Sequence, residues 1–325
     1  MTNALRTWLV TGGAGFIGSH LVTRLAETHG SVRAVDNLST GSRANLAHLN
    51  GRIEFIEGDL CDERVCARAV DGVELVFHVA ALPSVPRSLA DPWGSHDANV
   101  NATVRLLEAA RAAGVRRLVF SSSSSVYGDT QTLPKTEAAE PLPRSPYAAS
   151  KLAAEQYVLA YARAGLVEGV ALRYFNVFGP RQSPDSPYAA VIPLFFRAAL
   201  SGTPATVFGD GGQTRDFTYV DNVVDANLLA ATAPAESASG FAINVGAGER
   251  TSLNQLLALM EQVTGRAIAR RHHAARPGDV RDSLASLQRA AERLEYRPRV
   301  RLTEGLRRTW EWFEAREGAL TAGPD

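Results

Sequence analysis

The sequence predicts an α/β protein with a doubly wound parallel sheet and a smaller, mixed C-terminal lobe. Three observations support this prediction. Short apolar segments alternate with segments of helical length through the first half of the chain. The first apolar segment leads directly into a glycine-rich turn. After about residue 178 the alternation stops, and glycine and proline become frequent. Apolar strands separated by helices are typical of a parallel sheet that is buried on both faces.

The predicted elements follow from these patterns in chain order. We expect strands at Trp8–Thr11, Val32–Asp36, Ile53–Glu57, Leu75–His78, Arg117–Ser121 and Gly169–Arg173. We expect helices at about 15–28, 62–70, 95–113 and 147–164, with a weaker one near 43–48. Ligands of such sheets bind beyond the carboxyl ends of the strands, where Asp59, Ala80, Ala81 and Asn176 fall in this sequence.

The glycine-rich turn indicates a dinucleotide site. Its segment, TGGAGFIGS, fits the fingerprint Gly-x-Gly-x-x-Gly from Gly13 to Gly18, and the spacing of Gly12, Gly15 and Gly18 fits equally. Glycines let the backbone approach a pyrophosphate, and the following helix offers free N–H groups and the positive end of its dipole. A turn that serves tight packing alone is the less favoured interpretation.

Asp36 indicates which cofactor is bound. It ends the second predicted strand, eighteen residues after Gly18. A carboxylate at this place accepts hydrogen bonds from the adenosine ribose and repels a 2′-phosphate, which favours NAD over NADP. Arg33 and Arg43 keep the phosphorylated cofactor open as an alternative.

Composition excludes several classes of protein. The chain has 325 residues, 34 basic and 34 acidic side chains, and a formal charge of zero, which gives no reason to expect nucleic acid or an anionic membrane as partner. No apolar run approaches the roughly 20 residues that span a bilayer, and residues 1–7 do not resemble a signal peptide. We therefore expect a cytoplasmic protein, with Cys61 and Cys66 as free thiols. His272 and His273 lack companion ligands, so we expect a polar loop there and no metal site.

Tyr147 and Lys151 are the candidate catalytic pair. They lie four residues apart in SPYAASKLAAEQ, a spacing that puts both side chains on one face of a helix. An adjacent ammonium favours the phenolate form of tyrosine and lowers its pKa from about 10. A solvated helix face is the alternative for the pair taken alone. The serine run 121–125 follows an apolar strand directly, so it is better placed for a substrate hydroxyl than for a linker.

The motifs together resemble the extended short-chain dehydrogenase/reductases, and specifically the nucleotide-sugar epimerases of the UDP-glucose 4-epimerase type. The resemblance covers nearly the whole chain. It rests on TGGAGFIGS, VDNLSTG, GDL, HVAA, SSSSSVYG, YAASK, RYFNVFGPRQ, RDFTYVDN and RPGDVRDS, in the family's order. RYFNVFGPRQ and RDFTYVDN are the segments most specific to members that act on sugar nucleotides.

The resemblance implies a set of functional residues. Ser123, Tyr147 and Lys151 look like the catalytic trio, and Asn99 looks like the residue that supports the lysine through ordered solvent. The residues that would hold NAD are Gly12, Gly15, Phe16, Ile17, Gly18, Asp36, Asn37, Ser39, Thr40, Gly41, Asp59, Leu60, Ala80, Ala81, Asn99, Tyr147, Lys151 and Tyr174. Those that would contact a UDP-sugar are Ser84, Arg87, Ser123, Ser125, Tyr147, Asn176, Val191, Arg215, Arg276, Asp279 and Ser283.

Within the family, the serine run favours an epimerase. Sugar dehydratases carry two carboxyl residues after the catalytic Thr or Ser, and decarboxylases carry a glutamate at the second of these places; here Ser124 and Ser125 stand there. Elimination would lack its acid/base pair. The implied reaction oxidises the sugar reversibly at C4 and regenerates NAD. Alternatives are a 4-epimerase of uronic acids using residues 84–88 or 185–188, a net dehydrogenase or reductase, and a non-catalytic NAD-binding regulator.

Ser283 is expected to set the size of the sugar. In the family, a tyrosine at the corresponding place blocks 2-acetamido sugars, so a serine implies turnover of UDP-GlcNAc and UDP-GalNAc as well as UDP-Glc and UDP-Gal. We expect a Rossmann domain at 1–177, with 206–224 returning to it, a substrate lobe at 178–205 and 225–320, and a disordered tail at 321–325. Alanine- and leucine-rich stripes on helices 95–113 and 147–164 predict a homodimer; packing of both stripes on the sheet is the alternative.

Overall fold

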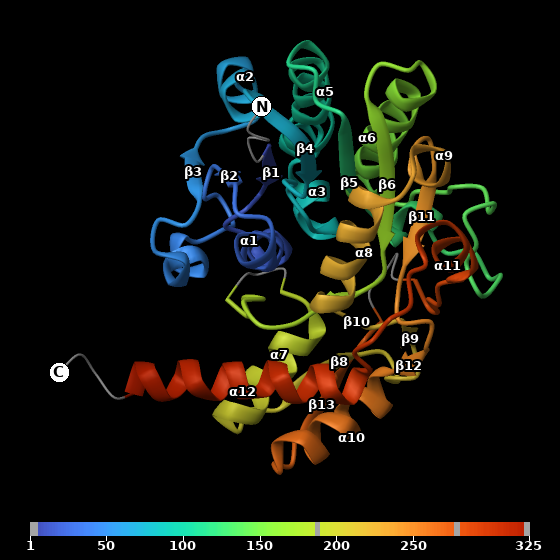
Figure 1. Ribbon diagram of the computed structural model, residues 1–325. Helices are drawn as coiled ribbons and strands as arrows, with labels where there is room; N and C mark the ends of the chain where they lie inside the picture. The colour runs from blue at the N-terminus through green and yellow to red at the C-terminus, as the bar shows by residue number, and fades with distance from the viewer. Residues whose placement is uncertain (1–5, 186–188, 276–279, 322–325) are drawn as a thin grey trace.

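A seven-stranded, fully parallel sheet dominates the computed structural model, which describes residues 6–185, 189–275 and 280–321 (Figure 1). The strand order is β11-β6-β5-β4-β1-β2-β3. The strands are β1 (Thr7–Thr11), β2 (Val32–Asp36), β3 (Glu54–Glu57), β4 (Val73–His78), β5 (Arg117–Ser123), β6 (Glu168–Tyr174) and β11 (Ala242–Val245). All six predicted strands are confirmed, and so is the doubly wound parallel fold.

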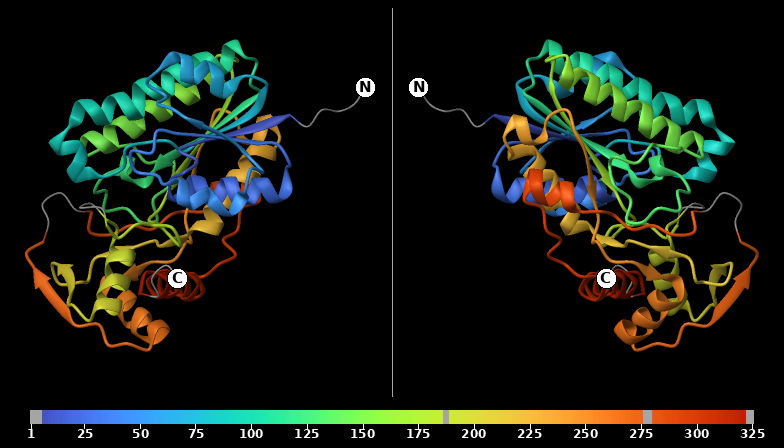
Figure 2. Two further views of the ribbon diagram at one scale, coloured as in Figure 1. Left: turned by 90° about the vertical axis from the view of Figure 1, so that its left-hand side faces the viewer. Right: turned by 90° about the vertical axis from the view of Figure 1, so that its right-hand side faces the viewer.

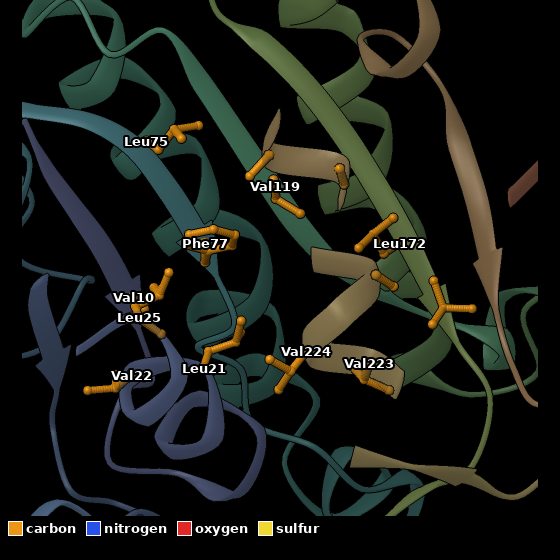
Figure 3. Packing of buried hydrophobic residues seen from close by; sticks show 14 of the residues in the cluster. Val10, Leu21, Val22, Leu25, Leu75, Phe77, Val119, Leu172, Val223 and Val224 are labelled. Atoms are coloured by element: carbon orange, nitrogen blue, oxygen red, sulfur yellow. The ribbon is translucent and has the colours of Figure 1, made fainter. Parts of the chain in front are cut away.

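Two layers of helices cover the sheet, and Figure 2 shows them on opposite faces. One layer contains α2 (Glu63–Val70), α5 (Ala102–Ala112) and α6 (Pro146–Arg163), and the other contains α1 (Phe16–Thr28), α8 (Val220–Thr232) and α11 (Gln288–Leu294). Because both faces are covered, the central strands are largely buried on both sides, as the TWLVT and RLVFSSS segments are. Figure 3 shows Leu21 and Leu25 of α1 and Val224 of α8 packed against the sheet around Phe77.

The carboxyl edge of the sheet carries several short elements. They are the 3₁₀ helices η1 (Arg43–Leu49) and η3 (Ser124–Tyr127), the helices α3 (Val85–Ala90) and α4 (Pro92–His96), and the π-helical turn η2 (Asp97–Asn101). The predicted helix 95–113 is therefore real, with one π turn between α4 and α5. Helix α6 begins where predicted, because Ser145 caps it by accepting from the Ala148 N–H, and Pro146 occupies its first turn.

The second lobe has a core of its own below the sheet in Figure 1. Its elements are β7 (Val177–Phe178), α7 (Val191–Ser201), β8 (Ala205–Phe208), β9 (Thr214–Arg215), β10 (Thr218–Tyr219), β12 (Thr251–Ser252), α10 (Leu253–Thr264), β13 (Arg270–His273) and α12 (Leu302–Thr321). Phe195, Phe196, Leu257, Trp310 and Phe313 are among its buried residues.

The structure divides the chain differently from the predicted boundaries. Strand β11 lies inside the proposed lobe 225–320, yet it pairs with β6 in the large sheet, and α9 (Ala235–Ala238) and α11 pack near it. The segment 206–224 returns to the sheet only at its end, where α8 begins, because β8 pairs with β13 in the lobe. The four-residue segment AINV was too short to be recognised as a strand.

Three smaller predictions have different outcomes. His272 and His273 lie in strand β13, so the predicted polar loop is wrong there; β13 is fully exposed, which hid its strand character. Cys61 and Cys66 are free, as predicted. Thr321 ends α12, and residues 322–325 of the predicted tail lie outside the described residues. Across the described ranges, no helix combines the length and the apolar character needed to cross a bilayer.

Candidate active site

A cavity of about 1040 Å³ lies at the carboxyl ends of the sheet strands, between the sheet and the second lobe. Loops after β1, β2, β3, β4, β5 and β6 line it, together with Arg215, Val280 and Ser283 from the lobe side. This is the edge at which a doubly wound sheet binds ligands. The cavity has two halves, one around the glycine-rich turn and one around Ser123–Ser125.

The glycine-rich turn forms a cradle that side chains would fill. Gly12 has φ +65°, and a Cβ there would lie 2.8 Å from the backbone of Ala80. A Cβ on Gly18 would lie 2.0 Å from the Gly12 carbonyl oxygen. Gly15 caps α1 without a side-chain hydrogen bond, so the first N–H groups of this helix remain available at the cavity. Close backbone approach and a helix N-terminus fit the pyrophosphate of a dinucleotide.

Asp36 lies directly beside the glycine turn, and both of its carboxylate oxygens already accept from the backbone. Oδ2 accepts from the Ala14 N–H at 2.9 Å, and Oδ1 accepts from the Leu38 N–H at 2.8 Å. Each oxygen keeps a further lone pair for a ribose hydroxyl. The carboxylate thus also joins the glycine turn to the end of β2.

The two arginines that kept NADP open have partners elsewhere. Arg33 pairs with Glu54 at 2.7 Å, and Arg43 pairs with Glu57 at 2.6 Å. Neither lines the cavity among the described residues. The residues present therefore fit NAD better than a cofactor with a 2′-phosphate.

Most residues predicted to hold the cofactor line the cavity. They are Gly12, Gly15, Phe16, Ile17, Gly18, Asp36, Asn37, Ser39, Thr40, Asp59, Leu60, Ala80, Ala81, Tyr147, Lys151 and Tyr174. Gly41 and Asn99 do not. Gly41 packs behind the turn, where a Cβ would lie 2.8 Å from the Ala14 carbonyl carbon. Asp59 is fixed as an anion: burial opposes ionisation, but the Cys61 N–H and the Asn37 amide donate to it and lower its pKa.

Tyr147, Lys151 and Ser123 meet at the boundary between the two halves. Tyr147 and Lys151 lie on successive turns of α6, and Ser123 ends β5. Burial raises the pKa of the Tyr147 phenol, while the Ser123 hydroxyl lowers it by hydrogen bonding. Burial also lowers the pKa of Lys151 to about 7, against the attraction of Glu155. In the protein without cofactor, burial therefore outweighs the phenolate stabilisation that the Tyr-x-x-x-Lys spacing predicts.

A buried ion pair fixes the helix of Lys151 to the strands beside it. Glu155, one turn after Lys151, is fully buried and accepts from Arg173 Nε at 2.9 Å and Nη2 at 2.6 Å. Ser122 donates to the same carboxylate at 2.6 Å. Since Ser122 precedes Ser123 and pairs with Arg173 across β5 and β6, this network sets the distance between the serine run and α6.

A second network joins the glycine turn to Tyr147 through His78. The Thr11 hydroxyl accepts from the N–H groups of Val79 and Ala80, so its proton points to His78 Nδ1 at 2.8 Å. His78 Nε2 then donates to Thr103, whose hydroxyl donates to the Asn99 carbonyl. These hydrogen-bond directions require the neutral tautomer of His78 in which Nε2 carries the proton. The neutral form is favoured because burial lowers the pKa of His78 to about 3.

Asn99 continues this second network toward α6. Its amide group donates to Ser150 Oγ at 3.0 Å and exchanges hydrogen bonds with the backbone of Leu82. Ser150 in turn donates to the Tyr147 carbonyl. The side chain of Asn99 thus anchors the backbone of Tyr147, and the predicted link from Asn99 to Lys151 through solvent stays a prediction.

The substrate residues predicted from the sequence are found in three places. Ser84, Arg87, Ser123, Ser125, Tyr147, Asn176, Arg215 and Ser283 line the cavity. Val191 does not line it and packs against the lobe core, although Ala189 and Ala190 beside it do. Arg276 and Asp279 lie outside the described residues.

Several lining residues were missed by the sequence analysis, and Lys135 is the most notable. Leu82, Pro83, Arg144 and Gln182 also belong to this group. Lys135 is 2% exposed and lies in the loop after Gly128. It faces the cavity because its backbone pairs with residues 284–286, more than a hundred positions later. No short sequence motif predicts such a contact.

A doubly wound sheet, a glycine cradle and a buried Tyr–Lys pair define a dinucleotide-binding α/β enzyme. A model of the NAD dependent epimerase/dehydratase family matches residues 8–246. UDP-glucose 4-epimerase of Mycolicibacterium smegmatis is 42% identical over 94% of this chain and 97% of its own. The chain belongs to the NAD dependent epimerase/dehydratase family, and NAD is its cofactor.

Solved structures of relatives agree with this assignment and differ in their ligands. UDP-N-acetylglucosamine 4-epimerase from Methanobrevibacter ruminantium, in complex with UDP-N-acetylmuramic acid, shows 39% identity and a TM-score of 0.90, covering 96% of this chain and 99% of its own. MoeE5 with UDP-glucuronic acid and NAD also shows 39% identity, with a TM-score of 0.86 and coverage of 95% and 99%.

Proposed function

We propose that this protein interconverts the gluco and galacto configurations of a UDP-sugar at C4. The observation that carries the proposal is the meeting of Tyr147, Lys151 and Ser123 at the middle of a cavity whose serine run, Ser123–Ser125, contains no carboxyl group. An elimination or decarboxylation would need an acid/base carboxyl beside the sugar ring. A reversible oxidation at C4 needs only the phenol, its ammonium neighbour and the cofactor.

Each residue of the trio has a distinct part in the proposed reaction. NAD, when bound, supplies reversible hydride acceptance. The Tyr147 oxygen takes the proton of the C4 hydroxyl and later returns it, while the Ser123 hydroxyl orients that group. The Lys151 ammonium would stabilise the phenolate when the tyrosine ionises, against the burial that raises the pKa of Tyr147. A hexose that turns over between the two steps receives its hydrogen on the opposite face.

We further infer that the substrates include 2-acetamido sugars. Ser283 is buried and lines the cavity, and its small side chain would leave room for an N-acetyl group on a hexose bound beside it. UDP-GlcNAc and UDP-GalNAc would then turn over beside UDP-Glc and UDP-Gal. Such space permits the larger sugar without excluding the smaller one.

In this proposal the part of the cavity around the glycine-rich turn is the cofactor half, and the part around Ser123–Ser125 is the substrate half. A 4-epimerase of uronic acids is the second candidate, because Arg87 and Lys135 line the cavity and we assign them to the substrate half. A purely regulatory role is less favoured, since it leaves the Tyr147–Lys151 arrangement beside Ser123 without a purpose. Net reductase activity would use the same trio, so it is distinguished by the fate of the cofactor. Retention of NAD through purification, with no net change in nicotinamide absorbance during turnover, would distinguish the epimerase from a reductase.

We also propose a homodimer whose interface is formed by the outer faces of helices α4 and α6. Most of the alanine- and leucine-rich residues of α5 and α6 pack on the sheet, as Leu106, Leu107, Val158 and Leu159 do. The support comes instead from Trp93, which is 78% exposed at the start of α4. Sedimentation velocity on the protein at micromolar concentration tests this assembly.

Replacement of Tyr147 by phenylalanine tests the catalytic proposal. We expect the rate of UDP-glucose to UDP-galactose conversion, followed by NMR, to fall by roughly 10²–10⁴-fold, the usual contribution of a positioned acid/base. Tyr157→Phe, on the exposed side of the same helix, is the matched control and should retain the wild-type rate. Equal rates for wild type and Tyr147→Phe would refute the mechanism.

A further inference from the structure

We propose that Lys135 is a specificity residue that pairs with an anionic substituent on the hexose, so that this cavity accepts acidic UDP-sugars. The inference rests on the proposed UDP-sugar function and assigns a role to a residue that the motifs of the family did not indicate. It follows from the way Lys135 is held, from its incomplete hydrogen bonding, and from the charges around it.

The backbone of Lys135 is fixed on both sides by the segment that contains Ser283. Its N–H donates to the Leu284 carbonyl at 2.8 Å, and its carbonyl accepts from the Ser286 N–H at 2.9 Å. The Asn244 amide donates to the same carbonyl at 2.9 Å. Lys135 is therefore held firmly beside the residue that is expected to limit the size of the sugar.

The Lys135 ammonium is buried without a full set of partners. Nζ donates to the Gly128 carbonyl at 2.8 Å, which uses one of its three N–H groups. No carboxylate among the described residues forms an ion pair with it. Burial of a cation without a counter-ion costs free energy. The Lys135 side chain lines the cavity, so a bound ligand can reach it. An anion on the substrate would supply the missing acceptor.

The charges of the residues that line the cavity also favour an anionic group on the substrate. Among the described lining residues the only carboxylates are Asp36 and Asp59, and both lie in the cofactor half. The substrate half contains Arg87, Arg144 and Arg215 in addition to Lys135. Burial lowers the pKa of Lys135, and of its charged neighbours Asp129 raises it while Arg215 lowers it. The described lining residues of this half thus include no carboxylate that would repel an anionic group on the hexose.

Hydroxyl groups complete the set of donors. Ser125 Oγ is buried without a hydrogen-bond partner, and the side chain lines the same half of the cavity. Ser283 lies beside Lys135 through the backbone pairing. An ammonium and two hydroxyl groups are donors suited to the oxygens of a carboxylate, whereas a neutral hydroxymethyl group needs no cation.

Replacement of Lys135 by glutamine tests this role, because glutamine keeps an N–H donor for Gly128 and removes the charge. We expect kcat/KM for UDP-glucuronate to fall by roughly 10- to 100-fold, the range for a hydrogen bond to a charged group, while the value for UDP-glucose changes less than about threefold. Arg271→Gln, on the exposed strand β13, removes a distant positive charge and should leave both values unchanged.

Binding measured in the Tyr147→Phe background separates this inference from the proposed function. Calorimetry there should show weaker binding of UDP-glucuronate when Lys135→Gln is added, with little change for UDP-glucose. Equal losses for the two sugars, or a wild-type protein that does not bind UDP-glucuronate, would overturn the role of Lys135. Absence of C4 conversion for every UDP-sugar, with intact selective binding, would instead overturn the epimerase proposal.

Discussion

The two halves of the cavity are built in different ways. The cofactor half consists largely of backbone: the cradle of Gly12 and Gly18, the open N-terminus of α1, and Asp36 tied to Ala14 and Leu38. The substrate half consists of side chains from segments far apart in the chain, such as Lys135 and Ser283. A site made of backbone tolerates little change in shape, whereas a site made of side chains can change its ligand by single substitutions.

In the cofactor half, the largest effect on NAD binding is expected from Gly18→Ala. The new Cβ would lie 2.0 Å from the Gly12 carbonyl oxygen, so the turn must shift away from the pyrophosphate. Overpacking of this kind costs about 1–3 kcal/mol, and a loss of that size in NAD binding would raise the dissociation constant roughly 5- to 150-fold. Calorimetric titration of the cofactor-free protein with NAD measures this effect.

Gly165→Ala is the matched control for that substitution. Unlike Gly18, Gly165 has a positive φ, +68°, but nothing lies within 4 Å of its Cβ position. It should lose some stability from backbone strain and bind NAD normally. If Gly18→Ala bound NAD as tightly as Gly165→Ala, the cradle would not be the reason for the glycine.

At the boundary between the halves, Lys151→Met should raise the stability of the protein and remove its activity. Burial lowers the pKa of Lys151 to about 7, below the ordinary value of 10.5. The unfolded chain therefore binds more protons between these two values, so the lysine destabilises the folded protein most below pH 7 and not at all above about pH 10.5. We expect Lys151→Met to abolish turnover and to raise the free energy of unfolding by a few kcal/mol, on the order of 1.4 per pKa unit.

Urea unfolding of the cofactor-free protein at pH 6 and pH 9 measures this prediction. The gain in stability should be larger at pH 6. Leu152→Met, at the next position of α6, changes no charge and should show no such dependence on pH. A gain that is the same at both pH values would mean that Lys151 is not held as a buried ammonium.

The same contrast explains how much could be predicted from the sequence. The six strands, the cradle and Asp36 follow from short-range patterns, because the strands are short apolar runs and the glycines of the cradle lie in one local turn. Strand β11 and Lys135 could not be predicted, since each depends on pairing with a distant segment, β6 in one case and residues 284–286 in the other. The raised pKa of Tyr147 was missed because the Tyr-x-x-x-Lys spacing gives a neighbouring charge but not the depth of burial.

The most selective effect, confined to one class of substrate, is expected from Ser283→Tyr in the substrate half. Ser283 is 6% exposed, and its backbone is fixed by donation to the Thr214 carbonyl at 3.2 Å, so the new ring must extend into the cavity. We expect kcat/KM for UDP-GlcNAc to fall by about 10- to 100-fold while that for UDP-galactose stays within a few fold, because only the larger sugar needs the space. Ser283→Ala removes the hydroxyl without adding volume and should keep both activities. Conversion assays with the two sugars in parallel measure this difference. Similar losses for both sugars would show that Ser283 does not limit the size of the sugar. The substrate half would then discriminate by other residues.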